Sequence, residues 1–282
     1  MRTPRGPCYA PAVTRADGRT LADHRPIEII PGFHRNAEGS VLYRAGRTVV
    51  LCTASIEEAV PAWMAGRGKG WLTAEYQMHP RANPDRREQR EGRGKALSGR
   101  TQEIQRLIGR ALRAAVHLEA LGERTIAIDC DVLEADGGTR TASVTGSFVA
   151  LALALGRLKA SGRIAAPILW DQVAAISVGH LEQGLALDLV YTEDVAARVD
   201  MNVVATTRGA LVEVQATAEG EAVPRQDIDR MVDLGLTGVR SLAVEQRRAI
   251  EAAGVDLASL FAEGRWLSLD NIAGAIAETR AP

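Results

Sequence analysis

The spacing of apolar residues changes several times along this chain, and the order of those changes constrains the fold more than any other feature. Residues 39–44 and 48–53 predict two strands, and Gly46 between them predicts a hairpin. Over residues 104–116 the apolar positions recur every three or four residues, which predicts a helix with one buried face. Residues 125–132 alternate strictly and predict another strand.

The second half of the chain continues this succession of helices and strands. Residues 142–159 are apolar and rich in alanine, which predicts a buried helix, and Pro224 stands where a long amphipathic helix begins. Four further strands are predicted at 173–179, 185–191, 199–206 and 211–216. The order strands, helix, strand, helix, strands, helix predicts a single α+β domain in which helices pack against a mixed or antiparallel sheet.

Both ends of the chain differ in composition from the part between them. Residues 1–24 are rich in Pro, Gly, Arg and Ala without any periodicity, and they predict a flexible N-terminal arm. Residues 25–253 carry the periodic pattern and form the predicted folded domain. Residues 254–282 are weakly helical and form a C-terminal extension for which the sequence indicates no role.

The cysteines and the lack of long apolar runs bear on where the chain works. Cys8, Cys52 and Cys130 are odd in number, widely spread and without metal or disulfide spacing, which favours a reducing cytoplasm. Cys52 and Cys130 lie in apolar segments and are interpreted as core residues. No apolar run approaches the roughly 20 residues that a membrane-spanning helix needs, so no membrane partner is expected.

Basic residues are concentrated in one segment of an otherwise nearly neutral chain. Residues 81–113 contain ten basic and four acidic side chains, a net charge of +6, whereas the whole chain carries −1. Such a local excess of positive charge predicts a surface for a polyanion. A solvated loop and helix face would have the same composition, and this remains the alternative.

A glycine-containing turn between a predicted strand and a predicted helix is the first candidate site. Gly137 and Gly138 let the backbone turn tightly and approach a ligand closely. The free N–H groups at a helix start favour an anion such as phosphate, to which Thr139 adds a hydroxyl and Arg140 a planar guanidinium. The alternative is a plain turn with Thr139 as the N-cap.

A second candidate stands at the start of the helix predicted at 104–116. Arg100 follows Ser98 and Gly99 there, so another helix N-terminus and another cation could hold the same anion. An ordinary N-terminal cap with an exposed arginine is the alternative.

The third candidate is a group of carboxylates. Asp194 and Asp200 flank a turn between two predicted strands and could converge, with Asp188 and Glu193 nearby. Converging carboxylates suit Mg²⁺, or one of them could protonate a leaving sugar hydroxyl. Acids that bond backbone N–H groups within a turn are the alternative.

The three candidates and the basic segment together describe a site for phosphate and a polynucleotide. A Walker loop is absent from the sequence, and its five histidines are scattered, with none placed persuasively as a base.

Several long strings resemble the ribonuclease PH family. They are GWLTAEY at 70–76, PRA at 80–82, GRTQEIQRLIGR at 99–110, DCDV at 129–132, DGGTRTA at 136–142 and DMNV at 200–203. The resemblance runs from about residue 15 to about residue 250, in the order in which the family has these strings. It implies the fold of the second domain of ribosomal protein S5 and a hexameric ring built as a trimer of dimers. It also implies an exoribonuclease that shortens precursor tRNA from the 3′ end, with inorganic phosphate as the attacking group and nucleoside diphosphates as products.

The resemblance also implies roles for particular residues. The family's phosphate site maps onto Arg100, Gly138, Thr139 and Arg140. Its paired aspartates, which bind Mg²⁺ (or Mn²⁺) or act as an acid, map onto Asp194 and Asp200. The arginines that contact tRNA map onto Arg81, Arg86 and, with one inserted residue, Arg90.

The sequence departs from the family pattern in places. Gln77 and His79 interrupt the usual string, and the spacing is shifted over 83–90 and at 96–97. These departures concern the tRNA contacts and not the phosphate site. Two alternatives stay open: a non-catalytic, RNA-binding ring subunit of an exosome-like assembly, and a hydrolytic exonuclease with metal-activated water.

Overall fold

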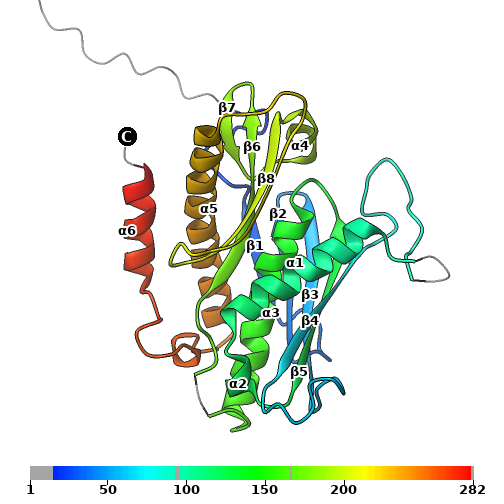
Figure 1. Ribbon diagram of the computed structural model, residues 1–282, viewed down its shortest axis with the longest axis vertical. Coiled ribbons are helices and arrows are strands. Elements are labelled where there is room, and N and C mark those ends of the chain that lie inside the picture. Colours follow the sequence, from blue (N-terminus) through cyan, green and yellow to red (C-terminus); the bar gives the residue numbers. More distant parts are fainter. Residues whose placement is uncertain (1–14, 93–95, 166, 281–282) are drawn as a thin grey trace, which may run out of the picture.

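Two β-sheets with helices packed against them make up the fold (Figure 1). The computed structural model describes residues 15–92, 96–165 and 167–280. The first sheet has the order β1-β2-β3-β5-β4, and only β4 and β5 run parallel. Its strands are β1 (Ile27–Pro31), β2 (Gly39–Ala45), β3 (Thr48–Glu57), β4 (Trp71–Met78) and β5 (Thr125–Glu134). A parallel pair needs a crossover, which α1 (Gly99–Ala115) and α2 (Leu118–Leu121) provide.

The second sheet is antiparallel throughout, in the order β7-β6-β8-β9. Its strands are β6 (Val173–Leu181), β7 (Gly184–Leu187), β8 (Val199–Thr206) and β9 (Leu211–Ala218). The sequence predicted helices on a mixed or antiparallel sheet, and the structure has one sheet of each kind. The strands predicted at 39–44, 48–53, 125–132, 173–179, 199–206 and 211–216 are all confirmed.

Helix α3 (Thr139–Ala160) packs against both sheets. Its buried residues join those of the first sheet and several from β6 and β8 in one apolar cluster. The Thr145 hydroxyl donates to the Ala175 carbonyl of β6 (3.0 Å) and accepts from the Ala175 N–H (3.1 Å). By length and composition α3 could cross a membrane, contrary to what the sequence suggested, but 89% of its most apolar window is buried inside the protein. It is therefore the core helix.

Helix α5 (Arg225–Ala252) covers the second sheet, and α6 (Leu269–Arg280) packs on α5. Helix α5 begins after Pro224, as predicted, and packs against β6 and β8. A short 3₁₀ turn (Ala258–Leu260) follows, and α6 then lies beside α5 (Figure 1). The predicted core positions of Cys52 and Cys130 are confirmed, since both are buried, whereas Cys8 lies outside the described residues.

The strand predicted at 185–191 is wrong in its second half. β7 ends at Leu187, and residues 191–196 form the short helix α4 (Tyr191–Ala196). Asp188 has a φ of +54°, a left-handed conformation that a strand cannot contain. The Glu193 carboxylate accepts the Val190 N–H (3.0 Å) and helps to start the helix.

The predicted flexible arm over residues 1–24 differs from the structure where the structure describes it. Arg15 is 7% exposed, and the Leu21 carbonyl accepts the N–H of Leu187 at the end of β7 (2.8 Å). Charge explains the difference, because Arg15 pairs with Glu193 of α4 and Arg19 pairs with Asp188 of the β7–α4 connection. Residues 1–14 lie outside the described residues.

Candidate active site

A cavity of about 550 Å³ lies where the two sheets and the starts of α1 and α3 meet. Seven of the nine site residues predicted from the sequence line it. They are Arg86, Arg100, Gly138, Thr139, Arg140, Asp194 and Asp200. The fold thus gathers at one place residues that are more than 100 positions apart in the sequence.

The turn that opens α3, residues 136–140, is called the phosphate loop below. Gly137 and Gly138 have φ values of +78° and +64°, which glycine adopts without strain. A Cβ atom on Gly137 would stand 2.5 Å from the Leu189 carbonyl oxygen, so the close packing also excludes any larger residue. Gly138, and not Thr139, is the N-cap, and the first N–H groups of α3 have no acceptor within the helix.

Thr139 is held by a residue that the sequence did not indicate. Its hydroxyl lies 3.0 Å from the phenol oxygen of Tyr76, which is buried on β4. Burial raises the pKa of Tyr76, so its hydroxyl stays protonated at neutral pH. One of the two hydroxyl groups donates to the other, so the second O–H and the remaining lone pairs are left for a ligand at the helix start.

The backbone of the phosphate loop is anchored to the β2–β3 turn. The Thr48 hydroxyl accepts the Asp136 N–H (3.0 Å) and donates to the Gly137 carbonyl (2.7 Å). The Arg25 guanidinium donates to the Asp136 carbonyl (2.7 Å). The carbonyl oxygens therefore point toward these donors, while the N–H groups that follow are left for the cavity.

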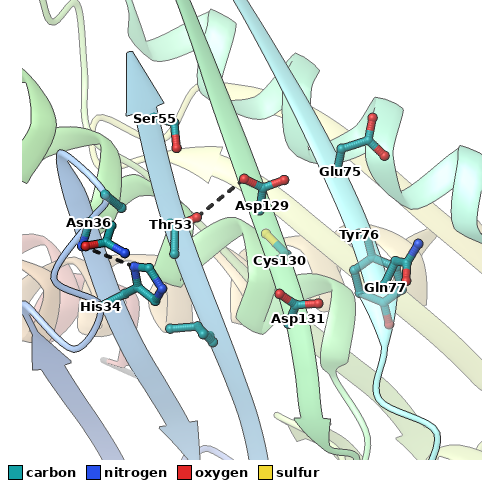
Figure 2. Close-up of a pocket in the computed structure, with 12 residues that line it drawn as sticks. His34, Asn36, Thr53, Ser55, Glu75, Tyr76, Gln77, Asp129, Cys130 and Asp131 are labelled. Carbon is teal, nitrogen blue, oxygen red and sulfur yellow. Dashed lines mark hydrogen bonds between the residues drawn. The ribbon is translucent and has the colours of Figure 1, made fainter. Parts of the chain in front are cut away.

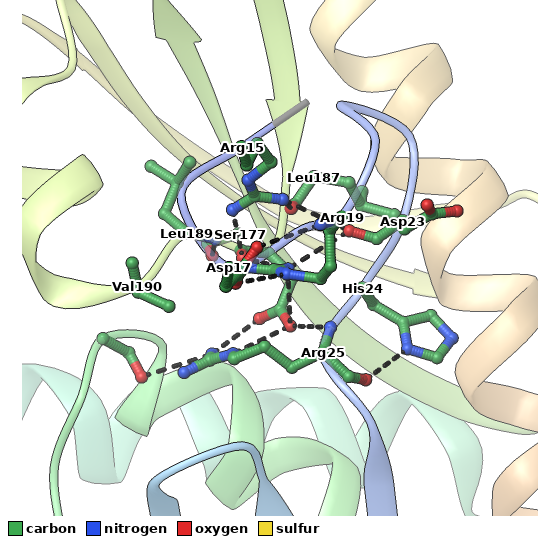
Figure 3. A network of polar contacts seen from close by, with 12 residues as sticks. Arg15, Asp17, Arg19, Asp23, His24, Arg25, Ser177, Leu187, Leu189 and Val190 are labelled. Atoms are coloured by element: carbon green, nitrogen blue, oxygen red, sulfur yellow. Dashed lines mark hydrogen bonds and ion pairs between the residues drawn. The ribbon is translucent and has the colours of Figure 1, made fainter. Parts of the chain in front are cut away.

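Three arginines of the N-terminal segment, Arg15, Arg19 and Arg25, converge on Asp188 (Figure 3). Arg25 binds both oxygens of the buried Asp188, with Nη2–Oδ1 at 2.6 Å and Nε–Oδ2 at 2.9 Å. Burial alone would raise the pKa of Asp188, but the Arg25 guanidinium holds it below its usual value. Arg15 pairs with Glu193 on α4 and donates to the Leu187 carbonyl. Asp188 and Glu193 thus have a structural role. They differ from the other two acids of the predicted cluster, Asp194 and Asp200.

The other pair, Asp194 on α4 and Asp200 on β8, faces the cavity. Burial and the neighbouring Asp194 carboxylate raise the pKa of Asp200 to about 6, against the opposing effect of Arg140. Two neighbouring carboxylates of this kind, once deprotonated, suit a divalent cation with remaining water and substrate ligands. Among the described residues, no group of three or more His, Cys, Asp and Glu side chains is placed to bind a metal.

Arginines on four different elements supply the positive charge of the cavity. Arg140 donates to the Gln215 side-chain oxygen on β9 (2.9 Å) and lies 3.7 Å from Glu103 of α1. Gln215 also donates to Glu103 (2.7 Å), so the position of Arg140 depends on both elements. Arg100 lies in the first turn of α1 and makes no hydrogen bond or ion pair within the described part of the chain. Ser98 caps that helix by accepting the Thr101 N–H (3.2 Å), so the capping alternative holds as well.

Residues 79–97, called the arginine loop below, follow β4 and carry the predicted RNA contacts. Arg86 lines the cavity and pairs with Glu88 (3.0 Å). Arg81 turns back to the Pro84 carbonyl (3.2 Å). Arg90 lies near Asp131, where burial raises the pKa of the carboxyl and the Arg90 charge only partly offsets that rise. The structure therefore brings one of these three arginines to the cavity. Residues 93–95, with two of the basic side chains, lie outside the described residues.

A second cavity, of about 510 Å³, lies over the first sheet (Figure 2). Its carboxylate and imidazole side chains are Glu75, Asp129, Asp131 and His34, and none of the described residues that line it is an arginine or lysine. Burial and the nearby Asp129 raise the pKa of Asp131, as expected for crowded carboxylates. This cavity does not suit a polyanion, which distinguishes it from the arginine-lined one.

The comparisons with known proteins agree with this geometry. Residues 23–155 match the model for domain 1 of the 3′ exoribonuclease family, and residues 171–238 match the model for its domain 2. The chain belongs to the 3′ exoribonuclease family. The similarity to ribonuclease PH that the sequence strings indicated is confirmed.

Curated members of the 3′ exoribonuclease family cover most of the chain. It is 53% identical over 239 residues to ribonuclease PH of Mycolicibacterium smegmatis, and 54% identical over 238 residues to ribonuclease PH of Mycobacterium leprae (strain TN). Each match covers 84% of this chain and 92% of the relative.

Solved structures of more distant proteins share the fold. Rice Rrp46 superposes with a TM-score of 0.68 at 18% identity, over 84% of this chain and 100% of that one. The Archaeoglobus fulgidus exosome with RNA bound to the active site gives 0.67 at 20% identity, over 82% and 92%. The fold is that of ribosomal protein S5 domain 2, as the resemblance implied.

Proposed function

We propose that this protein is a phosphate-dependent 3′→5′ exoribonuclease that shortens RNA, including precursor tRNA, by one nucleotide at a time and releases nucleoside diphosphates. The observation that carries the proposal is the single cavity in which an anion cradle and a carboxylate pair face each other. The curated relatives named ribonuclease PH support it. Because the reaction exchanges one phosphoester-type bond for another, the reverse addition of nucleotides from diphosphates is expected too.

The residues of the phosphate loop and α1 would hold inorganic phosphate. The N–H groups at the start of α3, the Thr139 hydroxyl and the guanidinium groups of Arg100 and Arg140 are the donors. An oxygen of this phosphate would form a bond to the phosphorus of the last phosphodiester, while the bond from that phosphorus to the 3′ oxygen of the preceding nucleotide breaks. Holding the two reactants in line removes much of the entropic cost of their encounter.

The leaving 3′ oxygen needs a proton or a cation. Asp200, with a pKa raised to about 6, can hold a proton close to neutral pH and release it to that oxygen. Asp194 and Asp200 are also the residues that would hold Mg²⁺ (or Mn²⁺), which would neutralise charge at the scissile phosphate. Positioning and electrostatics of this kind account for most of the catalysis in phosphoryl and nucleotidyl transfer.

RNA and further copies of the chain are the partners we propose. Arg86, at the cavity, and Arg81 and Arg90, in the same loop, are the proposed contacts to the tRNA backbone. A hexamer built as a trimer of dimers is the proposed assembly, and the cytoplasm is the proposed location. The structural neighbours named as exosome components support a ring-type assembly.

The nucleotide that is released tests the reaction directly. The purified protein is incubated with a 3′-extended tRNA and Mg²⁺, with and without inorganic phosphate, and the products are separated. We expect nucleoside diphosphates only when phosphate is present. Monophosphates without phosphate would indicate the hydrolytic alternative, and no release under either condition would favour the non-catalytic ring subunit.

Arg140→Ala tests the phosphate site. Removing a donor aimed at the reacting phosphate should lower phosphorolysis on the order of 10²–10³-fold, with RNA binding largely retained. Arg106→Ala is the matched control, because Arg106 lies on α1 with the same charge but does not line the cavity. Unchanged turnover of Arg140→Ala, measured by diphosphate release, would remove Arg140 from the site.

A further inference from the structure

A fourth arginine lines the active-site cavity, and the mechanism above does not use it. Arg47 lies in the turn between β2 and β3, and its side chain is exposed. Within the described residues it makes no hydrogen bond or ion pair, whereas Arg86 pairs with Glu88 and Arg140 with Gln215 and Glu103. Its charge is therefore available to a ligand at no cost of breaking a protein contact.

The position of Arg47 is fixed by the residues on either side of it. The Gly46 N–H donates to the Pro26 carbonyl (3.1 Å), and Thr48 is fully buried. The Thr48 hydroxyl holds both Asp136 and Gly137 of the phosphate loop, as described above. Arg47 is thus attached directly to the residue that anchors the phosphate loop, and its Cα cannot move away without breaking these buried bonds.

A guanidinium without a carboxylate partner, at the wall of a cavity that handles phosphates, suits a phosphate ligand. The inorganic phosphate already has donors from α1 and from the start of α3. A phosphodiester substrate brings further anions into the cavity, since RNA carries one negative charge per nucleotide. We propose that Arg47 binds a backbone phosphate of the RNA substrate beside the bond that is broken, an inference that rests on the proposed function.

The kinetics of Arg47→Ala distinguish RNA binding from phosphate binding. We expect the KM for a 3′-extended RNA to rise about tenfold, as for the loss of one charge-assisted hydrogen-bonding group, with the KM for inorganic phosphate unchanged. The slope of log Kd for RNA against log salt should fall by about 0.7–0.9, the contribution of one phosphate contact. Arg47→Lys keeps the charge and should recover part of the affinity.

Arg44→Ala is the matched control. Arg44 is exposed on β2 of the same hairpin, pairs with Glu28 (3.6 Å) and does not line the cavity. Removing it changes the net charge equally, so its KM for RNA should equal that of the wild type. An equal effect of the two variants would mean that only overall charge matters, and would overturn the proposal.

Two further outcomes decide the proposal. An unchanged KM for RNA in Arg47→Ala, or a rise in the KM for inorganic phosphate alone, would remove Arg47 from the RNA path. RNA affinity is also measured in the absence of phosphate, by fluorescence anisotropy, where the proposed reaction does not run. That measurement reports on Arg47 even if the wild type releases no nucleoside diphosphate, so a failure of the proposed function can be told from a failure of this inference.

Discussion

The phosphate loop and the arginine loop both present cations to the same cavity, but the protein holds them in opposite ways. The phosphate loop is fixed by hydrogen bonds from Thr48 and Arg25 and by a backbone contact that leaves no space for a Cβ on Gly137. The arginine loop has an exposed ion pair between Arg86 and Glu88 and a bond from Arg81 to a carbonyl of its own loop.

This difference agrees with the ligand that we propose for each loop. Inorganic phosphate has one shape, so preorganised donors bind it best and lose no energy on reorganisation. An RNA chain varies in sequence and conformation, and exposed ion pairs cost little to exchange, since each contributes about 0–1 kcal/mol. We therefore expect changes at the base of the phosphate loop to affect stability, and changes in the arginine loop to affect RNA affinity alone.

Asp188→Asn should have the largest effect on stability. Its charge is the partner of the buried Arg25, and leaving that guanidinium uncompensated should cost about 3–5 kcal/mol in the free energy of unfolding. Asparagine tolerates the left-handed φ of this position, so the backbone does not confound the result. Urea denaturation measures the change, with Asp229→Asn in an exposed ion pair on α5 as the control. Equal stability of the two variants would show that the network does not support the loop.

The same pair gives the wild type a specific acid sensitivity. The folded-state pKa of Asp188 is lowered, so its contribution to stability is fully present above the unfolded value of about 3.9 and is lost as the pH falls through the folded value. The free energy of unfolding of the wild type should decrease below about pH 4 more steeply than that of Asp188→Asn, which cannot take up this proton. Parallel pH profiles, measured by urea denaturation, would contradict this linkage.

Gly137→Ala should have the next largest effect. Alanine at a positive φ costs about 1–2 kcal/mol, and here its Cβ would also meet the Leu189 carbonyl oxygen and the Tyr191 nitrogen, at 2.5 and 2.9 Å. Gly162→Ala is a close control, because Gly162 has a φ of +69° but nothing within 4 Å of the added atom. Thermal unfolding should show a larger loss for Gly137→Ala, together with reduced phosphorolysis. Equal losses of stability in the two variants would mean that the contacts of the added Cβ at position 137 have no energetic effect.

The double variant Arg86→Ala, Arg90→Ala should have the smallest effect on stability, within about 0.5 kcal/mol, because both side chains are exposed. Its affinity for tRNA should fall, and the salt slope should decrease by about 0.7–0.9 for each phosphate contact that is lost. Fluorescence titration at several salt concentrations measures both, with the exposed Arg225→Ala on α5 as the control. A salt slope equal to that of the wild type would exclude both arginines from the RNA path.

Much of the fold could be predicted from the sequence because it depends on local periodicity. The alternation of apolar residues predicted β5 correctly, and apolar residues spaced every three or four positions predicted α1. The prediction of a strand over 185–191 was wrong in its second half. The strand ends because Asp188 adopts a left-handed conformation and pairs with Arg25, which is more than 160 residues away in the sequence. A contact of that range leaves no local signal.

The candidate site was predictable to a similar extent. Glycine at 137 and 138 and the cations beside them have a local physical meaning, so the phosphate loop was found from its own residues. Tyr76, Gln215 and Arg47 were missed because each lies on an element without any motif for phosphate. Arg47 lines the cavity itself, whereas Tyr76 and Gln215 bond to Thr139 and Arg140, which line it. Of these, only Tyr76 lies in a string that resembles the family. Conversely, Asp188 and Glu193 belong to the carboxylate group that the sequence singled out, but their arginine partners make them structural.

Helix α3 has a consequence for how the molecule unfolds. The two segments that match separate family models both depend on it, since Thr145 bonds to β6 on one side while the rest of the helix fills the core of the first sheet. Neither segment could lose its structure without exposing the apolar surface of the other, and α3 also begins at the candidate active site. Helix α3 therefore couples the folding of both segments to the shape of the proposed catalytic cavity, so partial unfolding of either half should inactivate the whole chain.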